Sequence, residues 1–433
     1  MALLIEINPI LRKLAALKGA PISPHFGAIS FFPRHNFKDS LFLCLKHQEW
    51  DGFEYVPTAL QFGAIGIVVE QVDFNRLINI PENIPVYVVE SMKNFMLALA
   101  VEFRAAYKGR AIAVTGSAGK SHTVELLTQL LSLRFRCQTN EQNRNNWIGI
   151  CDLMFSINKT TEVLVVELGG RLIGEIKALT ELCRPDTVLI TNALHAHLNT
   201  LGDLDNVMTM KSEILSVPSV KKAFVPKALM DKIKLPAGLG INAIPEKLDW
   251  DFEKLSGPHM KSVFNSVHCL AADSGLTDTE IHNFFKSDFK RPLYSLDILR
   301  DKQGRRFLND GRTNSLESVL NFLDALKIHL PVVELLILAG TSDLGLEADK
   351  EFIPVIVDRF AEIKIKKVIY LGSEPELFKK TLAARNGFTE FVSCDFDAEA
   401  IYRHIENLPV TSEYAIQGLM QLWYYTLLAK IIT

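Results

Sequence analysis

The stretch AVTGSAGKSHT, residues 113–123, is the feature that most restricts how this chain can fold. It lies between an apolar segment typical of a buried strand, RAIAVTG, and a segment typical of a helix, KSHTVELLTQLLSLRF. A glycine-rich turn between a strand and a helix presents unpaired backbone N–H groups, and the helix dipole favours an anion there. We therefore predict a phosphate-binding loop inside an α/β domain.

Two side chains of this stretch have the chemistry that a bound triphosphate requires. Lys120 supplies a positive charge for the outer phosphates, and Ser121 supplies a hydroxyl for Mg²⁺. Val114 stands where the common P-loop pattern has its first glycine, so an ordinary glycine-rich turn is the alternative interpretation. The loop residues predicted to bind ATP are Thr115, Gly116, Ser117, Gly119, Lys120 and Ser121.

The composition excludes several classes of protein. The chain has 433 residues, of which 48% are hydrophobic and 22% charged, with a formal net charge of -3, which argues against nucleic acid as a partner. The six cysteines contain no Cys-x-x-Cys pair, so we expect reduced thiols and a cytoplasmic location rather than a disulfide framework or a zinc site. No run of about 18 apolar residues is present, which predicts no membrane span.

Strand-like and helix-like segments alternate along the chain in three blocks, which predicts an α/β protein. The second block has near-continuous Val/Ile/Leu strands, the pattern of a buried parallel sheet. The third begins near Pro292 and has the pattern of a smaller nucleotide-binding domain. We expect a small N-terminal α/β domain (1–108), a central P-loop ATPase domain with a parallel sheet (109–292) and a C-terminal Rossmann-like domain (293–433).

The loop, read as T-G-S-x-G-K-S, resembles that of the Mur ligases, the ATP-dependent amide ligases of peptidoglycan precursor synthesis. Other segments resemble motifs of the same family, in the same order along the chain. The resemblance is strongest in the central block and weak after about residue 330. The segments are NEQNRNNWIGI (140–150), VVELGGRLIGEI (165–176), RPDTVLITNALHAHLNTLGD (184–203), MTMKSEIL (208–215) and LNDGRTNSLESVLNFLDAL (308–326).

The first block indicates which members of the family the chain resembles most. Its segment DSLFLCLKHQEWDGFEYVPTALQFGAIGIVVE resembles the family members that add D-alanyl-D-alanine (D-Ala-D-Ala) to a UDP-linked muramoyl peptide. This implies ATP and Mg²⁺ as cofactors, and a UDP-MurNAc-peptide and D-Ala-D-Ala as substrates, with an acyl phosphate as intermediate. It also implies that residues 1–108 bind the UDP precursor and that the protein is a monomer.

The same resemblance assigns roles to residues outside the loop. Glu167 and His197 would bind Mg²⁺ with Ser121, and Lys211 matches a lysine that several Mur ligases carry as a carbamate, a further metal ligand. From the residues alone, Glu167 stands out because it ends an apolar strand, whereas Lys211 could equally be a surface lysine. The implied catalytic residues are Lys120, Glu167, His197 and Lys211; Arg291, Asp310 and Asn314 would bind ATP, and Asn145 and Asn146 would bind substrate.

The chain departs from the family where the family binds adenine. The family's G-x-H-N-x-x-N helix reads GPHMKSV here, so Met260 and Val263 replace both asparagines and leave base recognition open. The family's later K-G-S-R motif is not visible either. The alternatives are a Mur-type ligase for another amine or acyl substrate, similar to folylpolyglutamate synthetase, and a non-catalytic or re-purposed relative that binds its ligands without turnover.

Overall fold

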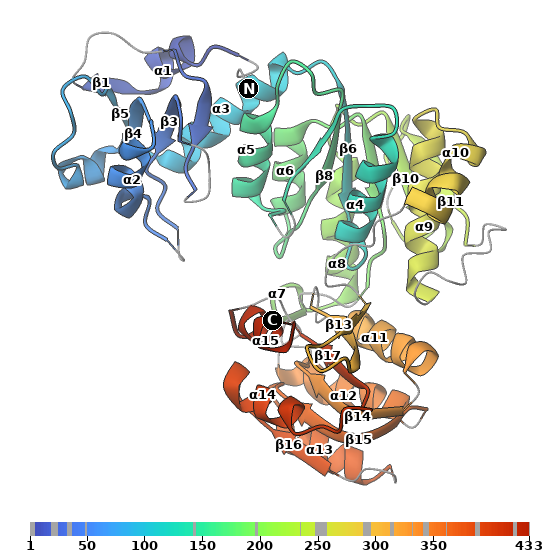
Figure 1. Ribbon diagram of the computed structural model, residues 1–433. Helices are drawn as coiled ribbons and strands as arrows, with labels where there is room; N and C mark the ends of the chain where they lie inside the picture. The colour runs from blue at the N-terminus through green and yellow to red at the C-terminus, as the bar shows by residue number, and fades with distance from the viewer. Residues whose placement is uncertain are drawn as a thin grey trace.

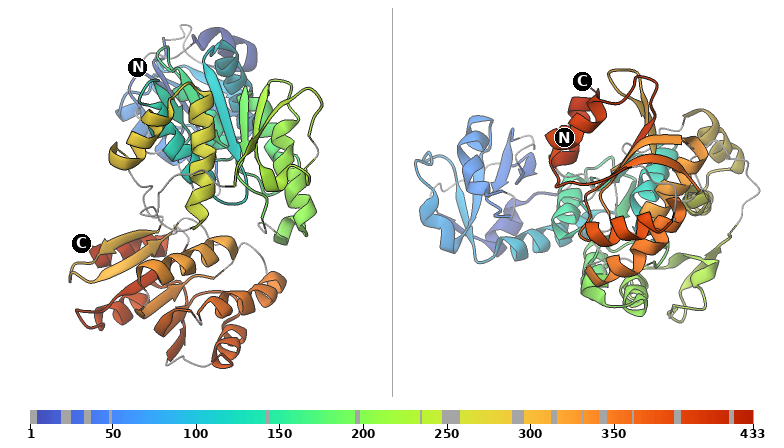
Figure 2. Two further views of the ribbon diagram at one scale, coloured as in Figure 1. Left: turned by 90° about the vertical axis from the view of Figure 1, so that its right-hand side faces the viewer. Right: turned by 90° about the horizontal axis from the view of Figure 1, so that it is seen from below.

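The chain forms three sheets, one after another along the sequence, each flanked by helices (Figure 1). The central sheet is all-parallel and the outer two are mixed, which confirms the expected α/β class. Figure 2 shows the third sheet and its helices at one end of the central unit. The computed structural model describes residues 5–18, 25–32, 37–47, 50–141, 144–194, 198–233, 235–246, 258–288, 296–311, 316–330, 332–340, 346–360, 362–385, 390–418 and 422–432.

The first sheet has five strands. They are β1 (Ala16–Lys18), β2 (Ala28–Ser30), β3 (Ser40–Leu43), β4 (Gly66–Glu70) and β5 (Val86–Val89), accompanied by the helices α1 (Asn8–Leu14), η1 (Gly52–Tyr55), α2 (Val56–Gln61), η2 (Gln71–Arg76) and α3 (Met92–Ala106). The order is β1-β5-β4-β3-β2, and β1 runs antiparallel to β5. Strands β3, β4 and β5 are short apolar runs with buried side chains, because both faces of the sheet are covered.

The central sheet has six parallel strands in the order β11-β10-β9-β6-β8-β7. The strands are β6 (Arg110–Thr115), β7 (Cys137–Thr139), β8 (Val163–Glu167), β9 (Thr187–Ile190), β10 (Lys222–Pro226) and β11 (Gly240–Ile244). The chain adds strands first on one side of β6 and then on the other, so β6 lies at the switch point, where α/β sheets bind ligands. The last two strands lie in a region where the sequence pattern predicted none.

Helices cover both faces of the central sheet (Figure 1). They are α4 (Lys120–Leu131), α5 (Trp147–Ser156), α6 (Glu175–Cys183), α7 (Leu198–Leu201), α8 (Leu204–Ser212), η3 (Glu213–Leu215), η4 (Lys227–Leu229), α9 (Pro258–Asp273), α10 (Asp278–Asn283) and the π-helical turn η5 (Phe284–Asp288). Helix α3 packs against α5 and α6, so it joins the first unit to the second, and α9 packs against α4.

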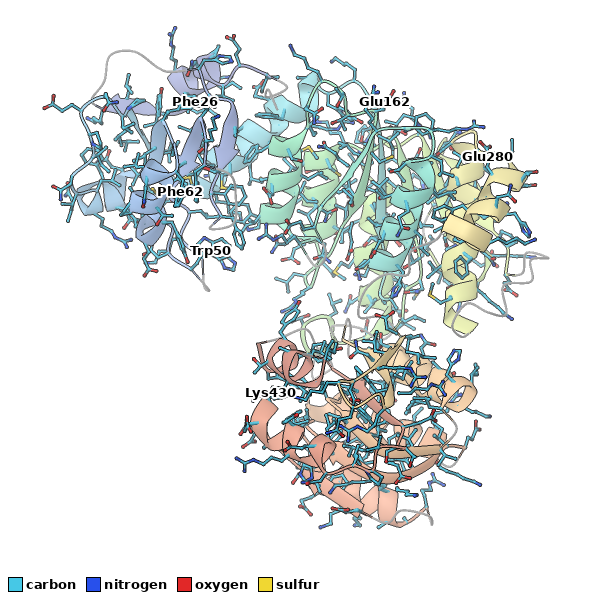
Figure 3. The ribbon with its side chains drawn as sticks, in the orientation of Figure 1. Phe26, Trp50, Phe62, Glu162, Glu280 and Lys430 are labelled. Atoms are coloured by element: carbon cyan, nitrogen blue, oxygen red, sulfur yellow. The ribbon has the colours of Figure 1, made fainter. Side chains whose placement is uncertain are left out.

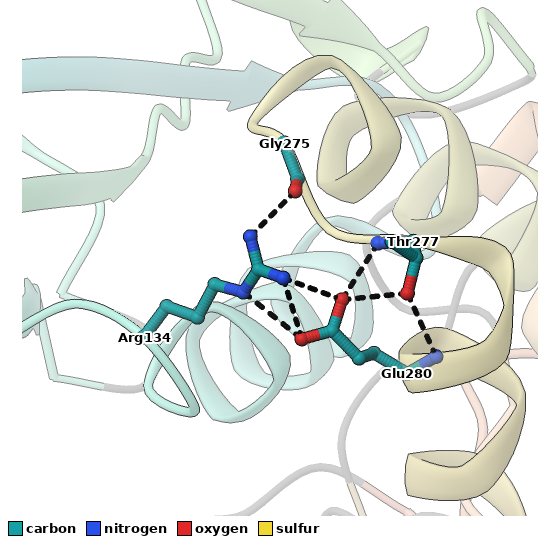
Figure 4. Close-up of polar contacts among 4 residues, drawn as sticks. All are labelled: Arg134, Gly275, Thr277 and Glu280. Carbon is teal, nitrogen blue, oxygen red and sulfur yellow. Dashed lines mark hydrogen bonds and ion pairs between the residues drawn. The ribbon is translucent and has the colours of Figure 1, made fainter.

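Arg134, just after α4, attaches the α9–α10 pair to α4 (Figure 4). Its Nε and Nη2 donate to the Glu280 carboxylate at 2.7–2.9 Å, and its Nη1 donates to the Gly275 carbonyl at 2.7 Å. Thr277 and Glu280 form a capping box at the start of α10. Hydrogen bonds from Thr277, followed by those from Arg134, lower the pKa of Glu280 to about 2, so this anchor stays charged at neutral pH.

The third sheet has the order β12-β13-β17-β14-β15-β16, with β12 antiparallel to β13. Its strands are β12 (Asp297–Arg300), β13 (Arg306–Asp310), β14 (Val332–Leu338), β15 (Lys364–Tyr370), β16 (Glu390–Ser393) and β17 (Tyr414–Gln417); its helices are α11 (Leu316–His329), α12 (Leu346–Phe360), α13 (Pro375–Ala383), α14 (Ala398–Glu406) and α15 (Leu422–Ile432). Sequence patterns did not predict β12 or β17, although β17 is a buried central strand.

Two expectations about the chain as a whole can be compared with the structure. Within the described ranges, no helix combines the length and the apolar character that crossing a membrane requires. All six cysteines are free, and three of them are buried. Burial raises the pKa of the Cys183 thiol to about 12, as expected for an unreactive core thiol.

A buried ion pair fastens the third sheet to its helices. Nε of Arg305 donates to Oδ2 of Asp301 at 2.6 Å, and the two side chains are 3% and 1% exposed. Nη1 of Arg305 also donates to the carbonyl of Ile405, in the last turn of α14, and to that of Leu408 just after the helix, and the Tyr414 hydroxyl donates to the Asp301 carboxylate. Because each charge is desolvated, removal of one leaves the other unpaired.

We expect Asp301→Ala to lower the free energy of unfolding of the C-terminal unit by about 3–5 kcal/mol, because the Arg305 guanidinium stays buried without its carboxylate. Urea unfolding followed by tryptophan fluorescence measures this. The control is Glu362→Ala, which removes an exposed pair with Lys327 and is expected to change the free energy of unfolding very little. Equal costs for the two variants would contradict the assignment.

Candidate functional site

The predicted phosphate-binding loop joins β6 to α4, and two of its residues require glycine. Gly116 has φ +147° and Gly119 has φ +78°, both in the region that L side chains avoid. A Cβ at Gly116 would also overlap Oγ1 of Thr191, which follows β9. Gly119 is the N-cap residue of α4, so the unpaired N–H groups of the helix start follow directly after the loop.

The residues directly after β9 form hydrogen bonds with the backbone of this loop. Oδ1 of Asn192 accepts from the N–H groups of Ser117 at 3.1 Å and Ala118 at 2.8 Å, and Nδ2 donates to the Ala118 carbonyl. Oγ1 of Thr191 donates to the same carbonyl at 2.7 Å. On the other side, buried Thr115 donates from Oγ1 to the Leu168 carbonyl at 2.9 Å. The loop is therefore braced from both neighbouring strands, β8 and β9.

A pocket of about 630 Å³ opens in front of the loop. Loop residues Ser117–His122 form one wall, and the polar side of α9 forms another. The third unit contributes Asp310, the last residue of β13, which is buried and lies in the same pocket. The structure thus brings together Ser117, Gly119, Lys120, Ser121 and Asp310, five of the residues predicted to bind ATP, from two separate sheets.

Lys120 points back into its own loop. Its Nζ donates to the carbonyl of Gly116 at 2.9 Å and to that of Ser117 at 3.3 Å. Burial lowers the pKa of the Lys120 ammonium, and the negative charge of Glu167 acts against this shift. Lys120 therefore lies in a weakly hydrated environment in which a phosphate would be a much stronger partner than two carbonyls.

Glu167 is the last residue of β8 and is only 4% exposed. Oε1 accepts a hydrogen bond of 2.7 Å from Nδ2 of Asn145, and Asn140 pairs with the Glu167 backbone through both ends of its amide. Asn145 therefore orients the carboxylate predicted to bind metal. Asn146 is the N-cap of α5, since its Oδ1 accepts from the Gly149 N–H at 3.1 Å.

Lys211 lies on α8 and is 1% exposed, which excludes the alternative of a surface lysine. Desolvation lowers the pKa of its ammonium to about 7, helped by the positive charge of Lys120 and opposed by Glu167. In a large fraction of the molecules, the Lys211 amine is therefore uncharged at neutral pH. In the described part of the chain, no hydrogen bond to its amine is found.

The side chains of Glu167 and Ser121 have oxygen atoms of the kind that Mg²⁺ binds. Magnesium usually takes one or two carboxylates and completes its shell with water and phosphate oxygens. Glu167 supplies a buried carboxylate, and Ser121 lies beside Lys120 at the pocket. No group of three or more His, Cys, Asp or Glu side chains that could hold a metal occurs among the described residues.

The two replaced asparagine positions on α9 are core positions. Met260 and Val263 are buried in the apolar cluster between α9 and α4. Val263 also packs on the loop, because a Cβ at Gly119 would lie 3.2 Å from its Cγ2. Both residues stabilise the helix that forms the pocket wall.

The structure does not describe some of the predicted site residues, and it shows others that the sequence did not predict. His197, Arg291 and Asn314 lie outside the described residues, so their roles stay predictions. The bracing residues Thr191, Asn192 and Asn140 were missed. The available signal was the position of a Thr-Asn pair directly after a buried strand, where polar side chains reach the sheet edge that carries the loop.

Comparisons with known proteins point to one family. Residues 114–234 match the sequence model of the Mur ligase middle domain. The UDP-N-acetylmuramoyl-tripeptide–D-alanyl-D-alanine ligase of Bacillus subtilis is 31% identical over 176 residues, which are 41% of this chain and 38% of that protein. The same ligase of Borreliella burgdorferi is 24% identical over 377 residues, or 78% of this chain and 79% of that protein. The first of these matches thus spans under half of its relative's length.

Solved structures share the whole arrangement of sheets. MurF from Acinetobacter baumannii superposes with a TM-score of 0.77 at 19% identity, covering 94% of each chain. The MurF ligase of Thermotoga maritima, solved in complex with ADP, has a TM-score of 0.72 at 19% identity, covering 93% of this chain and 96% of that one. At this identity the likeness establishes the three-sheet fold.

We expect Gly116→Ala to weaken the binding of inorganic triphosphate about tenfold or more, because the added Cβ overlaps Thr191 and displaces loop N–H groups from the phosphates. Isothermal titration measures this. The control is Gly304→Ala, which also has a positive φ but open space around its Cβ, and is expected to leave binding unchanged. Equal binding by the wild type and Gly116→Ala would contradict the assigned loop.

Proposed function

We propose that this chain is an ATP-dependent amide ligase of the Mur ligase type that adds D-Ala-D-Ala to a UDP-MurNAc-peptide, which is supported by the match to the Mur ligase middle domain and by the relatives described above. The observation that carries the proposal is the shared pocket, in which the phosphate-binding loop of the central unit meets Asp310 of the third unit. A nucleotide held by residues of two units is suited to a reaction that must exclude water while an acyl phosphate exists.

The proposed reaction uses the charges of the site in two steps. A substrate carboxylate oxygen attacks the γ-phosphorus of ATP, the bond to ADP breaks, and an acyl phosphate forms. The amine of D-Ala-D-Ala then attacks the carbonyl carbon, a proton is lost from nitrogen, and phosphate leaves. Lys120 would turn from its loop carbonyls to the phosphates, where a cation offsets the charge of the transferring group. Mg²⁺, bound through Glu167 and Ser121, would supply charge neutralisation at the phosphates.

Lys211 is proposed to act as a carbamate. Its uncharged amine can attack CO₂, which forms an N–C bond, releases a proton and yields a carboxylate-like group. A pKa near 7 makes the reactive amine abundant, since an ordinary lysine is protonated at neutral pH. The new negative charge would lie near Lys120, whose positive charge destabilises the unmodified ammonium. Together with Glu167 and Ser121, it would complete the protein's oxygen ligands for Mg²⁺.

The first unit is proposed to bind the UDP precursor. Trp50, labelled in Figure 3, is packed against Phe32 with ring centroids 4.8 Å apart and stacks on His47 at 4.2 Å. Arg144 of the central unit lies over the Phe32 ring at 3.9 Å. Among the described residues, Nε1 of Trp50 is a buried donor without a partner. Aromatic faces, a guanidinium and a donor suit a nucleobase with its phosphates.

We also propose the unit boundaries 1–108, 109–292 and 293–433, each of which falls between two sheets. The protein would work as a cytoplasmic monomer, with both substrates reaching the pocket between the second and third units. His197, Arg291 and Asn314 keep their proposed roles as metal and ATP ligands on the basis of the family resemblance.

The proposed function is tested by phosphate release from the purified protein with Mg-ATP, UDP-MurNAc-tripeptide and D-Ala-D-Ala. We expect release only when all three are present, because the acyl acceptor and the amine are both required for turnover. Lys120→Ala is expected to abolish release while leaving the circular dichroism spectrum unchanged. Binding of the muramoyl peptide without any release would contradict the ligase and favour the non-catalytic alternative; release with a different amine would favour another substrate.

We expect Lys211→Ala to lower turnover by about 10- to 100-fold, the usual cost of a lost group at a metal site. Acetate or formate should restore part of the activity by supplying a carboxylate in the space left by the side chain. The matched control is Lys177→Ala, which changes an exposed lysine and should neither lose activity nor respond to acetate. Full activity in Lys211→Ala, or loss without any rescue, would contradict the carbamate.

A further inference from the structure

Asn265, on α9, has a side chain that no motif singles out. It is 6% exposed and lines the pocket in front of the phosphate-binding loop. Its Nδ2 donates to the carbonyl of Pro245, directly after β11, at 2.9 Å. Because a carbonyl can only accept, the amide nitrogen must face Pro245, so the orientation of the amide is fixed. Oδ1 therefore presents a hydrogen-bond acceptor away from Pro245.

That acceptor is not used by the protein. In the parts of the chain that the structure describes, Oδ1 of Asn265 has no hydrogen-bond partner. Because this acceptor lies at the pocket and has no donor from the protein, a ligand that supplies a donor there can pair with it. The hydroxyl of neighbouring Ser266 is held by its own hydrogen bond, since it donates to the Ser262 carbonyl within the helix.

Asn265 lies on a different side of α9 from the residue that packs on the loop. Val263 contacts Gly119 of the loop, whereas Asn265, on another side of the same helix, reaches the end of β11. Strand β11 is three strands from β6, or about 14 Å at the usual spacing between strands. A nucleotide with its outer phosphates at the loop would extend its base along the pocket towards β11. The pocket lining there includes the apolar residues Pro226, Leu229 and Ile244 beside the charged residues Lys227, Lys232 and Glu246.

We propose that Asn265 recognises the nucleotide base, because its Oδ1 accepts a hydrogen bond from the exocyclic amine of a 6-aminopurine. A 6-oxopurine places an acceptor opposite the same oxygen, so two acceptors would meet without a proton between them. Asn265 thus determines base specificity in place of the two asparagines that Met260 and Val263 replace. This inference rests on the proposed nucleotide-binding function of the pocket.

The test compares Mg-ADP with Mg-IDP, whose bases differ only at position 6 and in the proton at N1. Isothermal titration of the full-length wild type should show about tenfold or more tighter binding of ADP. Asn265→Ala should reduce this preference about tenfold, mainly by weakening ADP, and should leave the binding of inorganic triphosphate unchanged. The unchanged triphosphate affinity shows that the variant is folded.

Ser266→Ala is the matched control, since it removes a neighbouring pocket hydroxyl that is already bonded within the helix, and its ADP preference should equal that of the wild type. A wild type that binds ADP and IDP equally would overturn the inference even if Asn265→Ala does not fold. An undiminished preference in folded Asn265→Ala would do the same. If the wild type binds inorganic triphosphate but neither nucleotide, the proposed ATP-dependent function fails as well.

Discussion

The contact between the phosphate-binding loop and the end of β9 sets the geometry of the site. Gly116 can approach Thr191 only because it has no Cβ, and this approach brings Asn192 within reach of two loop N–H groups. An amide oxygen between two N–H groups holds the loop curled without a bound anion. The loop shape therefore depends on two parallel strands that are neighbours in space and about 75 residues apart in sequence.

Three ionisable side chains lie together at this sheet edge, two of them basic and one acidic. Lys120 and Lys211 both lie near the Glu167 carboxylate, and burial disfavours the charged form of each lysine. A purely structural core would replace such a group with apolar side chains, because unpaired buried charge is costly. Two buried lysines beside one carboxylate instead suit added anionic groups, namely the proposed nucleotide phosphates and the proposed carbamate on Lys211. The buried basic groups are unfavourable in the free protein, and for the same reason they favour the binding of anionic ligands.

The sequence revealed the parts of the molecule that are encoded locally. The loop has its own glycine spacing, and Glu167 is conspicuous because a carboxylate ends the run VLVV. Strand β17 was missed because four residues, YAIQ, show no period, and only their position between β13 and β14 makes them central. Strand β11, GINAI, is a mostly exposed edge strand without an apolar pattern. The burial of Lys211 depends on tertiary packing, which no spacing along α8 could indicate.

The altered α9 shows why a lost motif does not establish a lost function. Met260 and Val263 were conspicuous in sequence because they fill positions at which the family has asparagines, yet both belong to the core between α9 and α4. Asn265 follows Val263 by two residues and therefore points to another side of the helix. An amide on that side can recognise a base only if β11 ends beside it, and the Pro245 carbonyl is there to orient it. In this chain the packing residues and the proposed base contact would thus lie on two sides of one helix.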